Sequence, residues 1–195
     1  LVGGKPRRVL PPQSASTYSW WGSRYAWSPD GAKIAYARTD QVGYIDLESG
    51  RSFPLAPFPP LNTHRDWIWV PELTWSPDSQ FIACTIHGPE PGRPDEESQR
   101  FEVWAFDLSG VVRARLTEPV GLWSAPRWSP WVAGDSTLAF AAAERPFSSY
   151  DSRYMLYLMD RDGSNKRVLF PWAGEPGLSP PIRYEWSPDG QRLVI

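Results

Sequence analysis

The tripeptide Trp-Ser-Pro occurs four times in this chain of 195 residues, and its regular recurrence limits the number of possible architectures. The copies begin at Trp27, Trp75, Trp128 and Trp186, so successive copies lie 48, 53 and 58 residues apart. In three copies the next residue is aspartate, and in two of these a glycine follows. Repetition on this scale indicates one supersecondary unit used several times in a row.

Each copy has the same local surroundings. A short segment ends in Trp-Ser-Pro, a turn follows, and an apolar stretch comes next, as in 34–37, 81–86, 138–141 and 193–195. A third segment alternates in character and runs to an aspartate (42–47, 101–108, 155–160), and a fourth follows a glycine-bearing turn (52–55, 112–116, 166–170). Such alternation with glycine at the turns is typical of antiparallel strands, and helical periodicity is nowhere sustained. The sequence predicts an all-β fold built from four-stranded units.

The element Trp-Ser-Pro-Asp-Gly is typical of a tight turn. Proline presets φ at the first central position, aspartate suits the second, and glycine tolerates the left-handed conformation that returns the chain. The serine and aspartate oxygens can accept hydrogen bonds from backbone N–H groups of the turn. This explains why aspartate recurs at this position without a catalytic or metal-binding role. The third copy has Trp131 in place of the aspartate and inserts residues up to 135, so we expect a longer and less regular turn there.

This pattern of Trp-Ser-Pro-Asp-Gly, an apolar strand, a strand ending in aspartate, a glycine turn and a closing leucine resembles the repeats of TolB-like β-propellers. The resemblance implies four-stranded blades arranged radially around a central channel. It places blades at 24–55, 73–117 and 126–170, the last strand of a preceding blade at 1–10 and the start of a further blade at 184–195. A partial propeller or fragment is favoured over a ring closed by 1–10, because the last blade would still lack a third strand. The exposed blade edges could then support self-association.

Bulk composition excludes several classes of partner. The formal net charge is −2 and the pI is near 5.7, so the chain has no broad cationic field for nucleic acid or an anionic membrane. No apolar run approaches the ~18 residues of a membrane span, and no membrane insertion is expected. Cys84 is the single cysteine, which excludes an intramolecular disulfide, and its apolar surroundings predict a buried, inert thiol.

The connections between predicted strands differ in length on the two faces of the disc. First–second and third–fourth turns are short, apart from the insertion in the third unit. The opposite face carries the long connections 11–24, 56–72, 87–100, 117–126, 143–153 and 171–184, and only 38–41 is short there. Insertions in a repeat protein collect on one face, often the binding face, so the sequence predicts recognition by the long connections.

These long connections also contain tryptophans that strand packing does not require, and a dense polar cluster. We predict a partner-binding site from Trp20, Trp21, His64, Arg65, Asp66, Trp67, Trp69, Trp123 and Trp172. Tryptophan and arginine are good anchors for a protein or peptide. The alternative is that the tryptophans cap the blades and that the polar cluster forms a salt bridge or loop hydrogen bonds.

Catalytic chemistry has little support in the sequence. There is no Gly-x-Ser-x-Gly motif and no phosphate-binding glycine loop, and two histidines cannot build a three-histidine metal centre. We therefore predict no catalytic residues, no metal and no cofactor, and a non-enzymatic scaffold that binds a protein or peptide. The alternatives are an accessory propeller of a prolyl-oligopeptidase-like or dipeptidyl-peptidase-like hydrolase, or a glycan-binding propeller. The TolB-like resemblance implies a periplasmic or extracellular setting.

Overall fold

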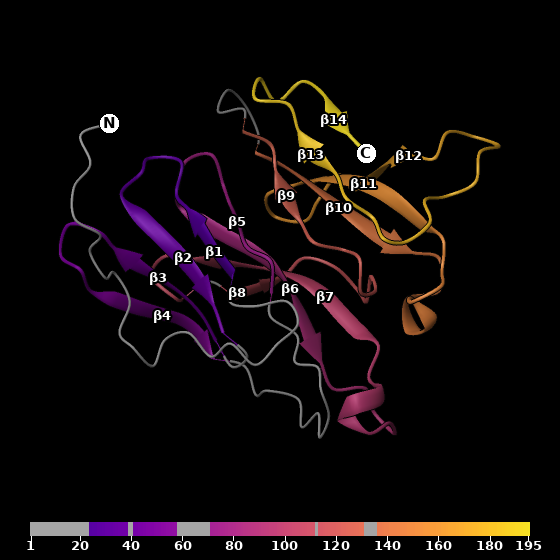
Figure 1. Cartoon of the computed structure of the whole chain (residues 1–195), viewed down its shortest axis with the longest axis horizontal. Helices are drawn as coiled ribbons and strands as arrows, with labels where there is room; N and C mark the ends of the chain where they lie inside the picture. Colours follow the sequence, from indigo (N-terminus) through magenta and orange to yellow (C-terminus); the bar gives the residue numbers. More distant parts are fainter. Residues whose placement is uncertain (1–23, 39–40, 58–70, 112, 131–135) are drawn as a thin grey trace.

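The computed structural model of the chain describes residues 24–38, 41–57, 71–111, 113–130 and 136–195 (Figure 1). Three four-stranded sheets and one two-stranded sheet follow one another along these residues. Their strands are β1 (Arg24–Trp27), β2 (Lys33–Ala37), β3 (Gln41–Asp46), β4 (Ser52–Pro57), β5 (Thr74–Trp75), β6 (Phe81–Gly88), β7 (Arg100–Asp107), β8 (Arg113–Arg115), β9 (Arg127–Trp128), β10 (Thr137–Ala143), β11 (Tyr154–Asp160), β12 (Arg167–Phe170), β13 (Glu185–Trp186) and β14 (Leu193–Val194). Two 3-10 helices, η2 (Asp95–Glu97) and η3 (Pro146–Ser148), lie in connections. The predicted all-β class is confirmed, since the described residues contain no α-helix.

Within each sheet the strands are antiparallel and lie side by side in chain order. The first strands of successive sheets, β1, β5, β9 and β13, contact one another and form a row, from which the remaining strands extend outward (Figure 1). This arrangement is the fan of blades expected for part of a propeller. The strand predicted at 1–10 and the longer turn predicted at 131–135 lie outside the described residues.

The Trp-Ser-Pro-Asp turn is held by its own side chains. Ser28 Oγ donates to Asp30 Oδ1 at 2.5 Å and accepts the backbone N–H of Lys33 at 2.9 Å. Asp30 Oδ1 accepts the N–H of Ala32 at 2.9 Å, and Gly31 has a φ of 71°, which glycine adopts without strain. The same serine–aspartate arrangement recurs in the second and fourth copies, with Ser76 and Asp78, and with Ser187 and Asp189.

Each repeated tryptophan has the same register with the following strand. The pairs are Trp27 with Ile34, Trp75 with Ile82, Trp128 with Leu138, and Trp186 with Leu193. The last three pairs pack on the preceding sheet, with Ala35 and Leu55 around the second pair, Ala83 and Val103 around the third, and Ala139 and Leu156 around the fourth. The hydrophobic core therefore consists of layers between successive sheets.

Tryptophan indoles also form hydrogen bonds between sheets. Trp75 Nε1 donates to the carbonyl oxygen of Ala26 at 2.9 Å, and Trp186 Nε1 donates to that of Arg127 at 3.0 Å. In both cases the acceptor residue directly precedes the tryptophan of the previous repeat. Trp27 has the same position in the first sheet but is 66% exposed. Trp75 and Trp186 thus combine apolar packing on the preceding sheet with a directed polar contact to it, whereas the buried Nε1 of Trp128 has no partner among the described residues.

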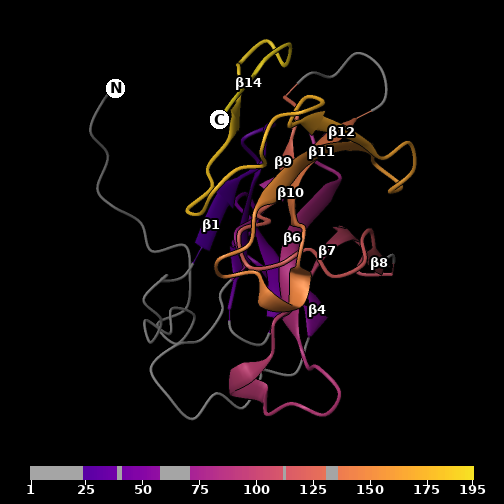
Figure 2. The ribbon, with the colours of Figure 1, turned by 90° about the vertical axis from the view of Figure 1, so that its right-hand side faces the viewer.

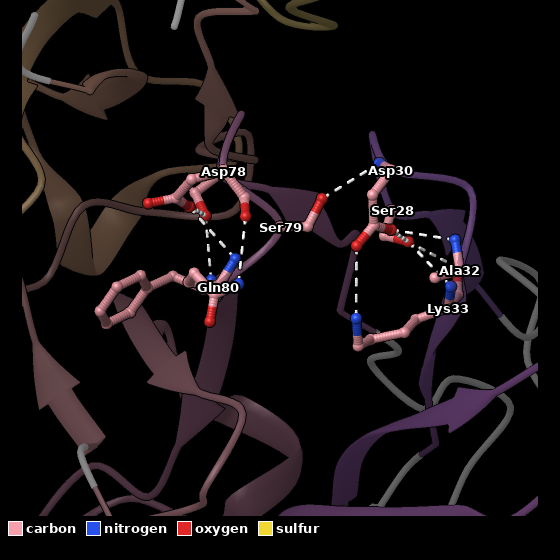
Figure 3. A network of polar contacts seen from close by, with 9 residues as sticks. Ser28, Asp30, Ala32, Lys33, Asp78, Ser79 and Gln80 are labelled. Carbon is pink, nitrogen blue, oxygen red and sulfur yellow. Dashed lines mark hydrogen bonds and ion pairs between the residues drawn. The ribbon is translucent and has the colours of Figure 1, made fainter.

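The short turns form a second link between neighbouring sheets. Ser79 has a φ of 59°, and its hydroxyl accepts the backbone N–H of Asp30 at 3.1 Å (Figure 3). Arg161, from the β11–β12 turn, donates to Asp78 Oδ2 at 2.6 Å and to Ser136 Oγ at 2.8 Å. These contacts join the first sheet to the second and the second to the third.

Candidate functional site

The longer described connections lie together at one end of the fan. Residues 89–99, 116–126, 144–153 and 171–184 all follow an even-numbered strand, and in antiparallel sheets such connections fall on the same side. In Figures 1 and 2 the magenta η2 lies near the bottom and the orange η3 lies below the middle, whereas the yellow β13–β14 turn lies at the top. We call the surface formed by these four connections the loop face.

Tyr154 and Ser149 join two connections of the loop face. The Tyr154 hydroxyl donates to the carbonyl of Ser149 at 3.0 Å and accepts the backbone N–H of Trp123 at 3.2 Å. Ser149 Oγ accepts the N–H of Leu122 at 3.1 Å and donates to Gln99 Oε1, in a third connection, at 3.3 Å. Burial of Tyr154 raises the pKa of its phenol, so the hydroxyl keeps its proton and its ability to donate.

The fourth connection is attached by backbone pairing. Tyr154 and Leu178 form an isolated antiparallel bridge, with N–H to carbonyl distances of 2.9 Å and 2.8 Å. Arg153 Nη1 donates to the carbonyl of Gly177 at 3.3 Å and also bonds to Ser179 Oγ. All four connections of the loop face are therefore held to one another by hydrogen bonds, which reduces the ordering that binding would require.

This cross-linked layer exposes large aromatic side chains. Phe147 and Tyr150 lie in 144–153 and are 44% and 75% exposed, and Trp172 in 171–184 is 70% exposed. The Trp172 ring makes an edge contact with Phe170 at a centroid distance of 6.1 Å, so its position is fixed on one side. Exposed aromatic rings on a rigid support are the side chains that anchor protein partners.

Three charged side chains lie close together where β5, β9 and β13 begin, on the same side of the sheets as the loop face. Arg127 Nη2 lies 2.5 Å from Glu72 Oε1, and Arg127 Nε lies 3.1 Å from Glu185 Oε1. Burial alone would lower the pKa of Arg127, but the two carboxylates outweigh it and raise the pKa above its usual value. The cluster ties three sheets together, and Glu185, with its side chain 72% exposed, can accept hydrogen bonds from a partner.

Of the nine sequence-predicted site residues, the structure describes two. Trp172 is exposed, whereas Trp123 is half-buried and packs against the core between the third and fourth sheets. The other seven lie outside the described residues: Trp20, Trp21, His64, Arg65, Asp66, Trp67 and Trp69. Partner binding by any of the nine remains a prediction.

Sequence reasoning missed several residues that the structure places at this end. Phe147 and Tyr150 stand in a connection whose length was noted but whose aromatic residues were not considered. The ionic cluster could have been found from the residue before each repeated tryptophan, which is arginine in the third copy and glutamate in the fourth. An aligned pair of opposite charges at one repeat position is a signal for contact between neighbouring units.

Within the described ranges, no three or more His, Cys, Asp or Glu side chains are arranged to hold a metal ion. The same residues include no helix long and apolar enough to span a membrane. Cys84 is fully buried, and its burial raises the pKa of the thiol, so it remains protonated.

Comparison with known proteins shows which other proteins share this fold. No family model matches the chain. An uncharacterized protein of Agrobacterium fabrum is 27% identical over 99% of the chain, which spans only 58% of that relative. Among solved structures, TolB from Acinetobacter baumannii superposes with a TM-score of 0.58 at 22% identity, over 87% of this chain and 36% of that one.

Two further structures have the same architecture. Oligogalacturonate lyase from Vibrio parahaemolyticus matches with a TM-score of 0.60 at 14% identity, covering 95% of this chain and 47% of the lyase. A prolyl endopeptidase matches with a TM-score of 0.54 at 17% identity, covering 77% of this chain and 22% of the peptidase. At these identities the likeness concerns the fold alone, which is that of the TolB-like β-propellers.

Proposed function

We propose that this chain is a non-enzymatic binding scaffold that recognises a protein or peptide on its loop face. The observation that carries the proposal is the exposure of Phe147, Tyr150 and Trp172 on connections cross-linked through Tyr154 and Ser149. Large aromatic area held in place loses little conformational entropy on binding, which favours recognition. The likeness to TolB structures is in keeping with a binding role, and the whole protein's partners are part of the same proposal.

Site-specific photo-crosslinking tests this function. A benzoylphenylalanine in place of Tyr150 is expected to capture a partner protein in cells, whereas the same probe in place of Val111 is not. Val111 is a matched control because it is 82% exposed and lies in the β7–β8 turn, at the opposite end of the fan. Equal capture from both positions would count against the loop face.

Titration with the purified partner then gives the contribution of each ring. Tyr150→Ala and Trp172→Ala are each expected to weaken binding by at least about tenfold, the loss of a typical aromatic hot spot, while Val111→Ala leaves it unchanged. Unfolding curves show whether the variants remain folded. Unaltered affinity in both aromatic variants would overturn the proposal.

The fold is also found in a lyase that acts on oligogalacturonate, so a glycan ligand is the second candidate. Stacking of a sugar on Trp172 would quench its fluorescence. We expect no saturable quenching by oligogalacturonate; saturation that is lost in Trp172→Ala would favour glycan binding over protein recognition.

A further inference from the structure

The outermost strands of the three complete sheets differ in how their free edges are protected. β4 contains Pro54 and Pro57, which have no N–H to offer, and β8 is only three residues long. β12 has neither safeguard, because its four residues Arg-Val-Leu-Phe include no proline. Both β4 and β12 have a register shift against the neighbouring strand, so a bulge does not distinguish them.

β12 is also the most exposed apolar strand among these three. Val168 and Leu169 are 48% and 36% exposed, and Leu169 is the extra residue at the register shift, since Val168 pairs with Tyr157 and Phe170 with Leu156. On the side away from β11, its backbone pairs with no other described strand. A strand with an unpaired backbone and apolar side chains can accept an added strand from another chain.

The start of β12 has an excess of positive charge. Lys166 and Arg167 are exposed, and neither forms an ion pair with another described residue. Lys166 Nζ lies 5.6 Å from the centre of the Tyr157 ring, which keeps the ammonium close to the sheet. By contrast, Arg115 of β8 is paired with Glu102 and Glu118. Positive charge is thus available at the start of β12, whereas that of Arg115 in β8 is neutralised.

We propose that the free edge of β12 is a docking strand for an extended peptide segment that carries carboxylates beside alternating apolar residues. The segment adds a fifth strand to the third sheet, its carboxylates meet Lys166 and Arg167, and its apolar side chains cover Val168 or Leu169. This edge adjoins the loop face at the contact of Phe170 with Trp172, but it is a different surface, and the docking strand goes beyond the binding function proposed for the loop face.

Selection from a phage-displayed library of random octapeptides tests the docking strand. The expected outcome is enrichment of peptides with acidic residues next to an alternating apolar pattern. Affinities of the enriched peptides are then measured for Val168→Glu and Arg167→Glu, which repel carboxylates without changing the backbone. Each variant is expected to lower the affinity at least tenfold, whereas Val111→Glu, at a site that is 82% exposed and lies in the β7–β8 turn, has no effect.

Backbone pairing gives an independent readout. In a strand-addition complex, N-methylation of the peptide at alternate positions is expected to abolish binding, since only every second N–H faces β12. No enrichment, indifference to both β12 variants, or tolerance of N-methylation at every position would each overturn the docking strand. Loss of binding in Tyr150→Ala, at a loop-face position outside β12, would instead assign the peptide to the loop face, so the two proposals fail separately.

Discussion

Gly121 allows two connections of the loop face to pack closely. Its φ is +95°, and a Cβ there would lie 2.6 Å from Ser149 Cβ and 2.9 Å from Tyr154 Oη. Gly121→Ala is therefore expected to lower the free energy of unfolding by about 2–4 kcal/mol, because a strained φ and a clash add. Urea unfolding measures the loss.

A second glycine separates the two contributions. Gly174 has a φ of +88° but no atom within 4 Å of a Cβ. Gly174→Ala should thus cost only the backbone strain, about 1 kcal/mol. If Gly121→Ala and Gly174→Ala lower the free energy of unfolding equally, close contact with Ser149 and Tyr154 is not the reason why position 121 needs a glycine.

His87 makes stability depend on pH. Burial lowers the pKa of His87 from 6.5 to about 4, although the hydrogen bond to the Ser98 carbonyl and the charge of Asp95 oppose the shift. The unfolded chain takes up the proton first, so the stabilisation is complete above pH 6.5 and declines as the pH falls toward 4. We expect a loss of about 2 kcal/mol between pH 7.5 and pH 5.

Denaturant unfolding at these two pH values tests the assignment. His87→Phe can retain the stacked contact with Phe101, whose ring centre lies 4.3 Å away, but should lose most of the pH dependence. His64→Gln is the control for the other histidine and should leave the slope intact. A decline that disappears in His64→Gln and persists in His87→Phe would contradict the prediction.

At the scale of the element, the repeated tryptophan is expected to matter only where a preceding sheet covers it. Trp75 is 6% exposed and donates to Ala26, whereas Trp27 has the same motif position and is 66% exposed. Trp75→Phe should cost about 2–3 kcal/mol, from one lost hydrogen bond and an imperfectly filled space. Trp27→Phe should change stability by less than about 0.5 kcal/mol. Thermal unfolding of both variants tests the contrast, and equal losses would refute it.

The strands were predictable because each repeat carries its own local signals. Proline, aspartate and glycine at fixed offsets specify the turn, and period-two alternation specifies the strands, so neither depends on distant residues. Contacts between repeats are less regular. Trp128 shows this: its buried Nε1 has no partner among the described residues, and its backbone N–H bonds instead to Thr74 Oγ1 at 3.1 Å. A pattern of residue types predicts the register but not each inter-sheet bond.

The loop face was only partly predictable for a related reason. Connection lengths and Trp172 can be taken from the sequence, since both are local properties. The bonds from Leu122 to Ser149 and from Trp123 to Tyr154 span 27 and 31 residues and exist only once two sheets are packed. The cluster of Glu72, Arg127 and Glu185 likewise combines charges from three sheets. Such sites can be recognised only from the packed arrangement of the sheets, because their residues come from distant parts of the sequence.

For the molecule as a whole, the contact of Arg161 with the second sheet is one of several polar links that supplement the apolar layers between neighbouring sheets. Arg161 Nη2 lies 2.6 Å from Asp78 Oδ2, and its guanidinium stands 4.8 Å from the centre of the Phe81 ring. Burial alone would raise the pKa of Asp78, but hydrogen bonds from Ser76, the Gln80 N–H and Arg161 outweigh it and leave the pKa below its usual value. The aspartate is thus ionised at neutral pH and available to couple two sheets.

A double-mutant cycle on this pair measures the coupling. Asp78→Asn, Arg161→Gln and the double variant are expected to give an interaction free energy of about 1 kcal/mol, because the guanidinium is also held by Ser136 and Phe81. The same cycle on Asp30 and Lys33 should give an interaction free energy of less than about 0.5 kcal/mol. Lys33 Nζ lies 3.3 Å from Asp30 Oδ2, and both residues belong to one turn. If the two cycles agree, the Arg161–Asp78 pair adds no more to the coupling of the second and third sheets than an ion pair within one turn adds to its own sheet.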